Sequence, residues 1–304
     1  MLEIAIMIEG QNGLTWPRWQ KIVHLVEEAG FVGLFRSDHF TNSNPPDMES
    51  LDLWPSLTWL AGSTTQIEFG PLVTPFSFRH PVHTARMAAA VDDLSNGRLV
   101  LGLGAGWNER EHNLFGFDLL EPKARFDRFN EGMEVVTRLL QSDEPVTFEG
   151  KYYQLRGATL LPRPQHPGGP RILIGGNGVK RTLSYVVRYA SEWNCVTLTP
   201  EEFARKSSKL SDMLVEAGRD PGSVRRSMMT GCVFGKDDAS LNRKLQMYGR
   251  SPEELQQRGI VAGSLGAIKD QLQALEQAGL QRIMLQWLDL DDLESMEVLA
   301  QGIL

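Results

Sequence analysis

The stretch NGRLVLGLGAGWNEREHNLFGF, residues 96–117, decides how the rest of the chain is interpreted. The turn signal Asn96-Gly97 precedes a short apolar run, residues 98–103, whose length and flanks favour a buried strand over a helix. Three glycines follow at alternate positions, namely Gly102, Gly104 and Gly106. Glycines at a strand end remove the side chains that would keep a flat ligand off the backbone. We therefore expect a ligand at the end of this strand.

Two other interpretations of the same stretch are open. A dinucleotide-binding fingerprint needs a further glycine at the right offset and an acidic residue downstream, and neither is found here. A glycine-lined strand end that only packs tightly against a neighbouring strand is the second alternative.

The chain repeats one unit, a short apolar strand, a loop and an amphipathic helix, about eight times without a break in composition. This repeat predicts an α/β fold, a single-domain (β/α)8 TIM barrel over residues 1–304, in which a hairpin at about 146–164 is a peripheral insertion. The expected barrel strands cover residues 3–8, 31–36, 67–73, 98–103, 171–174, 193–198, 225–234 and 282–286. The expected helices include residues 18–29, 81–94, 122–141, 179–189, 200–217, 265–277 and 290–302.

Composition limits the class of protein and of partner. The 304 residues are 41% hydrophobic and 23% charged, which is enough for a large core. The net charge of −7 comes from interspersed acids and bases, so the basic stripe that nucleic acid requires is absent. No apolar run approaches 18 residues and no signal peptide is evident, so we expect a cytoplasmic protein without a membrane partner. Cys195 and Cys232 show no metal-like spacing.

Chemistry-bearing residues follow several of the expected strands, at the face where a parallel barrel carries its site. Asp38 and His39 end the second strand, and an imidazole titrating near neutrality beside a carboxylate suits proton transfer. Glu9 follows the first strand, with Trp16 nearby. The histidines His80, His83 and His112 form no ligand spacing with His39, so we expect no metal site.

A glycine-rich turn, Gly175-Gly176-Asn177-Gly178, separates the fifth strand from its helix. Converging backbone N–H groups at such a turn and at a helix N-terminus make an anion-binding concavity. Lys180 and Arg181 oppose the helix dipole unless an anion is bound. We expect phosphate there, and a purely conformational turn is the alternative.

These motifs together resemble a known family. RSDHF at the second strand end, GPLVTP at the third, the 96–117 stretch at the fourth and ILIGGNGVKRTL at the fifth resemble the bacterial luciferase-like monooxygenase superfamily, in its deazaflavin-dependent branch. The resemblance implies a flavin-type ring at the barrel mouth, coenzyme F420 or alternatively FMN, with His39 as the proton-handling catalytic residue. It also implies a non-prolyl cis peptide at Leu72-Val73. The cofactor contacts that it implies are Asp38, His39, Leu72, Val73, Thr74, Gly106, Asn108, Gly175, Gly176, Asn177 and Gly178.

The substrate is less defined. Sugar-phosphate dehydrogenases of this family place a glutamate after the glycine-rich stretch, where this chain has Trp107. That departure favours an apolar or aromatic small molecule, with candidate contacts at Glu9, Trp16, Phe40, Trp107 and Trp287.

The function expected from the sequence is hydride transfer between coenzyme F420 and a small organic substrate, with His39 or water supplying the proton. A reduced-FMN monooxygenase that uses oxygen is one alternative, and a non-catalytic flavin-binding barrel is another. A homodimer is expected, for which the hairpin offers a surface.

Overall fold

The strands close into a barrel in the computed structural model, which describes residues 1–304. Neighbouring barrel strands are parallel, and the sheet closes where the Phe69 amide donates to the Arg98 carbonyl oxygen at 3.1 Å. The eight barrel positions are occupied in chain order by β1 (Glu3–Ile8), β2 (Gly33–Arg36), β3 (Glu68–Pro71) with β4 (Thr74–Pro75), β5 (Val100–Gly104), β8 (Arg171–Gly175), β9 (Glu192–Val196), β10 (Arg225–Val233) and β12 (Arg282–Gln286). The predicted (β/α)8 architecture is confirmed.

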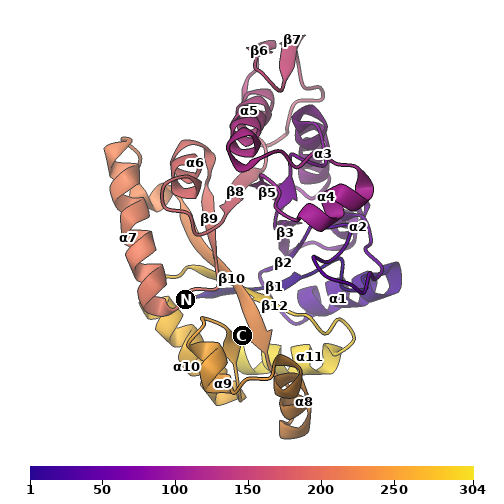
Figure 1. The fold of residues 1–304 in the computed structure, drawn as a ribbon, viewed down its shortest axis with the longest axis vertical. Coiled ribbons are helices and arrows are strands. Elements are labelled where there is room, and N and C mark those ends of the chain that lie inside the picture. The colour runs from indigo at the N-terminus through magenta and orange to yellow at the C-terminus, as the bar shows by residue number, and fades with distance from the viewer.

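Helices surround this barrel on the outside (Figure 1). They are α1 (Trp16–Glu28), α2 (Leu53–Ser63), α3 (Pro81–Leu94), α4 (Glu109–Phe115), α5 (Pro122–Gln141), α6 (Thr182–Tyr189), α7 (Pro200–Glu216), α8 (Asp238–Tyr248), α9 (Pro252–Gln256), α10 (Leu265–Gln277) and α11 (Leu293–Ile303). A two-residue strand, β11 (Val261–Ala262), pairs with β10. None of the helices combines the length and hydropathy that a membrane-crossing segment needs.

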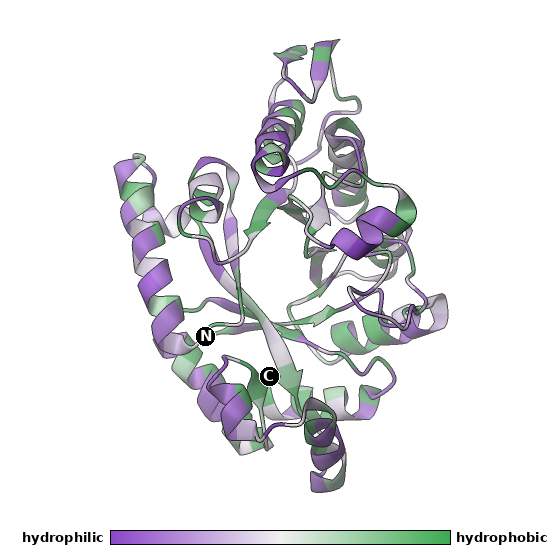
Figure 2. Ribbon diagram, in the orientation of Figure 1, coloured by the Kyte–Doolittle hydropathy of each residue, from purple (hydrophilic) through white to green (hydrophobic).

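The core has two parts because successive strand residues point to opposite faces. Along β1, Ile4, Ile6 and Ile8 pack outward in the large cluster between strands and helices. Ala5 and Met7 point inward, where they join a small interior cluster completed by Phe35, Val100, Leu173 and Met284. The ribbon in Figure 2 shows hydrophilic residues along much of the outer helices α7 and α10 and hydrophobic residues on strand β8.

The N-terminal ends of the strands carry an interlocked set of charges. Arg282 at the start of β12 is 1% exposed and bonds Glu68 at 2.6 Å and Glu3 at 2.8 Å. It also lies 3.4 Å from Glu192, which is 2% exposed. Arg225 pairs with the same glutamates. We call these five residues the basal charge ring, because they occupy the barrel end opposite the C-terminal strand ends.

The third barrel strand is interrupted between β3 and β4. The Leu72-Val73 peptide there is cis, as the resemblance implied. A Cβ atom at Gly102 would lie 2.1 Å from the Pro71 carbonyl oxygen, and one at Gly104 would lie 2.5 Å from Val73 Cγ2. The interpretation of these two glycines as room for a ligand is corrected, since they make room for the interrupted neighbouring strand.

The predicted hairpin is confirmed as an antiparallel pair, β6 (Val146–Glu149) and β7 (Gln154–Ala158), lying beyond α5 in Figure 1. The Glu131 carboxylate of α5 accepts backbone N–H groups of its turn at 2.7–3.2 Å, which holds the hairpin against that helix.

Three predicted helix boundaries are wrong. The helix after the glycine turn begins at Thr182 instead of residue 179, because the turn continues through Arg181. The last helix begins at Leu293, where the Asp292 side chain caps it by accepting the Ser295 amide at 3.1 Å. The first begins two residues early, at Trp16.

Candidate active site

The C-terminal ends of the strands surround a cavity of about 470 Å³. This volume falls within the range of roughly 300–1,000 Å³ typical of small-molecule pockets. Of its 24 lining residues, 12 are hydrophobic, and none is lysine or arginine. The predicted site residues that line it are Glu9, Asp38, His39, Leu72, Val73, Gly106, Trp107, Gly175 and Gly176. The charged groups at the cavity wall are therefore acidic, apart from His39.

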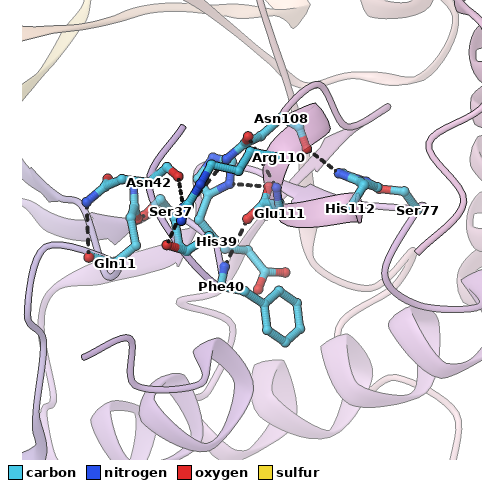
Figure 3. A network of polar contacts seen from close by, with 12 residues as sticks. Gln11, Ser37, His39, Phe40, Asn42, Ser77, Asn108, Arg110, Glu111 and His112 are labelled. Carbon is cyan, nitrogen blue, oxygen red and sulfur yellow. Dashed lines mark hydrogen bonds and ion pairs between the residues drawn. The ribbon is translucent and has the colours of Figure 1, made fainter. Parts of the chain in front are cut away.

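His39 is held by a glutamate that comes from a distant part of the chain. Its Nδ1 atom lies 2.7 Å from Glu111 Oε1, and the other carboxylate oxygen accepts the Phe40 amide at 3.0 Å (Figure 3). Glu111 is fully buried on α4. Because His39 Nδ1–H donates its hydrogen bond to this carboxylate, Nε2 is the ring nitrogen left free for a substrate.

The surroundings of His39 favour its protonated form. Burial opposes the charge, but the hydrogen bond and negative charge of Glu111, with smaller contributions from Glu9 and Asp38, outweigh it. The net effect raises the pKa of His39 above its usual 6.5. A histidine with a raised pKa at the wall of a cavity is suited to donate a proton near neutral pH.

A second histidine close by shows the opposite arrangement. His112 Nδ1 lies 2.6 Å from the Asn108 carbonyl oxygen and its Nε2 lies 2.8 Å from Ser77 Oγ (Figure 3). Burial lowers the pKa of His112. Both ring nitrogens are used within the protein, so His112 joins α4 to the loop after β4 and has no nitrogen left for chemistry.

Asp38 is buried and committed to protein partners. Thr74 Oγ1 donates to it at 2.7 Å, and Arg79 pairs with both of its oxygens. These bonds tie the end of β2 to β4 and to the loop that follows. Asp38 thereby sets the position of the neighbouring His39 backbone.

Glu9 is also held in place. Gln11 donates to one carboxylate oxygen at 2.9 Å and Gln286 to the other at 2.5 Å. Its carboxylate lies in the cavity wall with acceptor capacity still available, since each oxygen has two lone pairs.

The glycine turn after β8 contributes backbone groups. Gly175 and Gly176 line the cavity, with Gly176 at a positive φ of 127°. The N-terminus of α6 has no side-chain cap, and Thr182, its first residue, also lines the cavity. Asn177 points away, because its side chain forms two hydrogen bonds with the Val196 backbone at 2.7 and 2.9 Å. Gly178 is exposed and accepts the Leu183 amide.

The structure does not bring three of the predicted aromatic contacts to this cavity. Trp287 was expected at the rim, but it is 1% exposed, under Lys244 Nζ at 4.6 Å from its ring centre. Trp16 packs edge-on against Trp59 on the outside of the barrel. Phe40 points into a cluster with Phe78, Phe115 and Phe117. A strand-end position alone does not fix the direction of a side chain, which is why these expectations are corrected.

Two predicted cofactor contacts, Thr74 and Asn108, do not line the cavity but bond to residues that position its wall. Thr74 is buried against Asp38, as described above. Asn108 is 3% exposed, caps α4 through the Glu111 amide and donates to the Thr41 carbonyl oxygen at 3.3 Å. Its backbone and side chain therefore place α4, and with it Glu111.

Glu111 was missed from the sequence. The pattern Asn108-x-x-Glu111 indicates a helix capping box, in which the glutamate returns to its own cap. Here the carboxylate instead reaches His39 and Phe40, 72 and 71 residues earlier. A second acidic residue beside Glu109, on a helix that follows a glycine-rich strand end, was the available signal.

The sequence as a whole matches one protein family. The profile of the family described as luciferase-like monooxygenase matches residues 4–298. The chain belongs to the luciferase-like monooxygenase family. Within it, the chain is 30% identical over 216 residues to an F420-dependent glucose-6-phosphate dehydrogenase of Kineococcus radiotolerans. This alignment covers 70% of the chain and 63% of the dehydrogenase.

Two further similarities bear on this luciferase-like protein. It is 30% identical over 197 residues to a phthiodiolone/phenolphthiodiolone dimycocerosates ketoreductase of Mycobacterium tuberculosis, covering 64% of the chain and 50% of the ketoreductase. Its fold matches an F420-dependent secondary alcohol dehydrogenase, solved with an F420-acetone adduct, at a TM-score of 0.83 and 17% identity, over 100% of this chain and 99% of the other.

Proposed function

We propose that this protein transfers hydride between coenzyme F420 and a small uncharged organic substrate. The observation that carries the substrate class is the cavity wall, where acidic groups occur without a single lysine or arginine. A sugar phosphate would need a cationic anchor for its phosphate, whereas a neutral carbonyl compound or alkene would not. The relatives named for F420 support the choice of cofactor.

The residues fit a flat ring with a phosphate-bearing tail. Leu72 and Val73 form one apolar wall. Gly175 lies beside this wall and adds no side chain to it, since a Cβ atom on Gly175 would meet Val73 Cγ1 at 3.5 Å. The second half of the turn, Asn177-Gly178, and the uncapped start of α6 offer N–H groups to a phosphate, whereas the Gly176 N–H is bonded to the Asn194 carbonyl oxygen. When bound, coenzyme F420 supplies a hydride donor or acceptor at C5 of its ring.

The chain's own residues handle the proton. In the direction of substrate reduction, the hydride adds to an electron-poor carbon and His39 Nε2 donates the proton that completes the product. In the direction of oxidation, the same nitrogen accepts the proton from the substrate hydroxyl. Glu111 is a positioning residue, because it fixes the His39 ring and tautomer through Nδ1 at 2.7 Å without lying at the reacting atoms.

Trp107 is the best supported of the candidate substrate contacts. Its ring lies edge-on to His39, with centroids 5.6 Å apart, and its side chain is 61% exposed. An indole at the cavity mouth offers an apolar surface to a substrate seated near His39 and excludes water from it.

Turnover with a set of probe compounds tests this proposal. Reduced coenzyme F420 is mixed with the protein without oxygen, and cyclohexenone or cyclohexanone is added while the visible absorption of the oxidised cofactor is followed. We expect oxidised cofactor to form with an uncharged acceptor, and no reduction of oxidised F420 with glucose 6-phosphate. Turnover of glucose 6-phosphate alone would contradict the proposed substrate class. Oxygen-dependent product formation with reduced FMN alone would favour the monooxygenase alternative.

We also propose that the protein forms a homodimer and that it is located in the cytoplasm. A homodimer is tested by light scattering on the eluting chromatographic peak, where a monomer mass would contradict it. A cytoplasmic location is tested by fractionation of the source cells.

A further inference from the structure

A cluster of three metal-ligating side chains lies far from the cavity. Asp92 and Asp93 occupy the last turn of α3, and His166 comes from the proline-rich segment between β7 and β8. One donor atom from each residue lies within 4.8 Å of the others. Since α3 runs back from the cavity end of the barrel, its last turn lies towards the opposite face.

Asp92 is the residue that points to a ligand. It is 1% exposed, and neither of its carboxylate oxygens has a hydrogen-bond partner. The Nδ1 atom of His166 lies 3.4 Å from this carboxylate and also has no hydrogen bond. A buried charged carboxylate without hydrogen-bond partners is unfavourable unless it takes up a proton or a cation compensates it.

The helix makes the negative charge harder to accommodate. The C-terminal turn of a helix carries a partial negative charge, so two aspartates there are destabilising by themselves. A cation bound between them removes that cost. No lysine or arginine forms an ion pair with either of these aspartates.

The backbone leaves room for the imidazole. Gly97 has a φ of 82°, and a Cβ atom on it would lie 2.7 Å from two atoms of the His166 ring. The Asp93 carboxylate accepts the Gln165 amide at 2.9 Å, which fixes the residue next to His166. The three donors thus come from segments that are held against one another.

We propose that Asp92, Asp93 and His166 bind a divalent transition-metal ion of the zinc type. Two carboxylates and one imidazole suit Zn²⁺ or Co²⁺ better than Mg²⁺, which prefers oxygen ligands alone. Bonds of about 2.0–2.1 Å put neighbouring donors roughly 3.0–3.4 Å apart, close to the Asp92–His166 distance of 3.4 Å. One carboxylate oxygen of Asp93 lies within 4.8 Å of the other two donor atoms.

Such an ion would act as a structural clamp. It would join the end of α3 to the segment that leads from the hairpin into β8, and so to the strand that carries the glycine turn. It takes no part in the proposed hydride transfer, so its presence is tested independently of activity.

Metal titration of the chelator-treated full chain tests the proposal. We expect Zn²⁺ to raise the thermal midpoint by about 3 °C or more at saturation, and Mg²⁺ at the same concentration to have no comparable effect. Co²⁺ should bind with the visible absorption of a coordinated ion. No binding of Zn²⁺ or Co²⁺ would overturn the proposal and leave Asp92 and His166 as an ordinary buried pair.

Three variants assign the ligands. Asp92→Asn and His166→Gln keep the shape of each side chain, and each should weaken Co²⁺ binding at least tenfold. His24→Gln, an exposed histidine on α1, is the matched control and should bind as the wild type does. If Asp92→Asn does not fold, His166→Gln decides alone, because its side chain is partly exposed. Unchanged Co²⁺ binding in His166→Gln would contradict the assignment.

Discussion

The two ends of the barrel both bury charge, but they use it differently. In the basal charge ring, Arg282 and Arg225 neutralise Glu3, Glu68 and Glu192. At the cavity, the buried acid Glu111 holds one histidine, His39. No lysine or arginine lines the wall, and Arg79, which pairs with Asp38, is not among the lining residues. The charges at the closed end pair with one another, whereas the mouth leaves one nitrogen, His39 Nε2, free to act.

The pKa directions of Glu68 and His39 follow the same division, whereas burial raises the pKa of Glu192 in the ring. Opposite charges lower the pKa of Glu68 against the effect of its burial. At the mouth, acids raise the pKa of His39 against the effect of its burial. One arrangement holds a carboxylate in its charged form for stability, and the other holds a proton on a group that a substrate can reach.

The largest expected effect is on stability, at the ring. Arg282→Ala leaves the buried Glu192 without its nearest cationic partner, which should lower the free energy of unfolding by about 3–5 kcal/mol. Urea denaturation measures it. Arg188→Ala is the matched control, since that exposed arginine pairs with Glu134 at 3.6 Å and should cost at most about 1 kcal/mol. An equal loss of unfolding free energy in the two variants would mean that the basal charge ring contributes no more to stability than a surface ion pair.

The next effect is on chemistry, at the mouth. His39→Ala should slow hydride transfer about 100-fold, because the proton donor is lost, while coenzyme F420 affinity stays within about threefold. Stopped-flow single turnovers with cyclohexenone separate the two quantities. His83→Ala, on the exposed face of α3, is the control. Lost cofactor binding with an unchanged rate in the remaining complex would show that His39 only binds the ring.

Glu111→Gln should have an intermediate effect, about tenfold on the rate. Removing the carboxylate removes what raises the pKa of His39, so the alkaline limb of the reduction rate should move to lower pH. NMR titration of the histidine rings measures this directly, with His112 as a neighbouring ring whose pKa lies below 6.5. An unmoved pH profile would mean that Glu111 serves only the packing of α4.

The His39–Glu111 pair should also make the free energy of unfolding depend on pH. Because the pKa of His39 is raised in the folded protein, its stabilising contribution is complete below 6.5 and disappears as pH rises through the folded pKa. The stability difference between wild type and Glu111→Gln should therefore shrink from acid to alkaline pH, as denaturation at several pH values would show. A difference that grows towards alkaline pH would reverse this assignment.

The smallest effect is expected at Trp107. Its ring contacts His39 only at its edge and is largely exposed, so Trp107→Ala should raise KM for an uncharged probe several-fold and change kcat little. Steady-state kinetics with cyclohexenone measure both. A large loss of kcat with unchanged KM would place Trp107 among the groups that act in the transition state.

The barrel could be predicted because its signal is local and repeated. Each strand and helix has its own periodicity, and the residues directly after the strands, such as His39 and Gly175, could be placed at the mouth by topology alone. The directions of side chains could not be predicted in this way, and Trp287 was therefore expected at the cavity although it is buried elsewhere. Pairs that form only after closure were also hidden, since Glu3 and Arg282 lie 279 residues apart. Glu111 was hidden for a further reason, because its spacing from Asn108 has an ordinary explanation as a helix cap.

The measurement that tests the central claim most directly is a titration of tryptophan fluorescence with oxidised coenzyme F420 and, separately, with FMN. If the mouth is a deazaflavin site, F420 should bind at micromolar concentration or tighter and FMN at least tenfold more weakly. Tighter binding of FMN would contradict the choice of cofactor. Binding of neither would mean that the Gly175–Gly178 turn is conformational and that His39 serves some other chemistry.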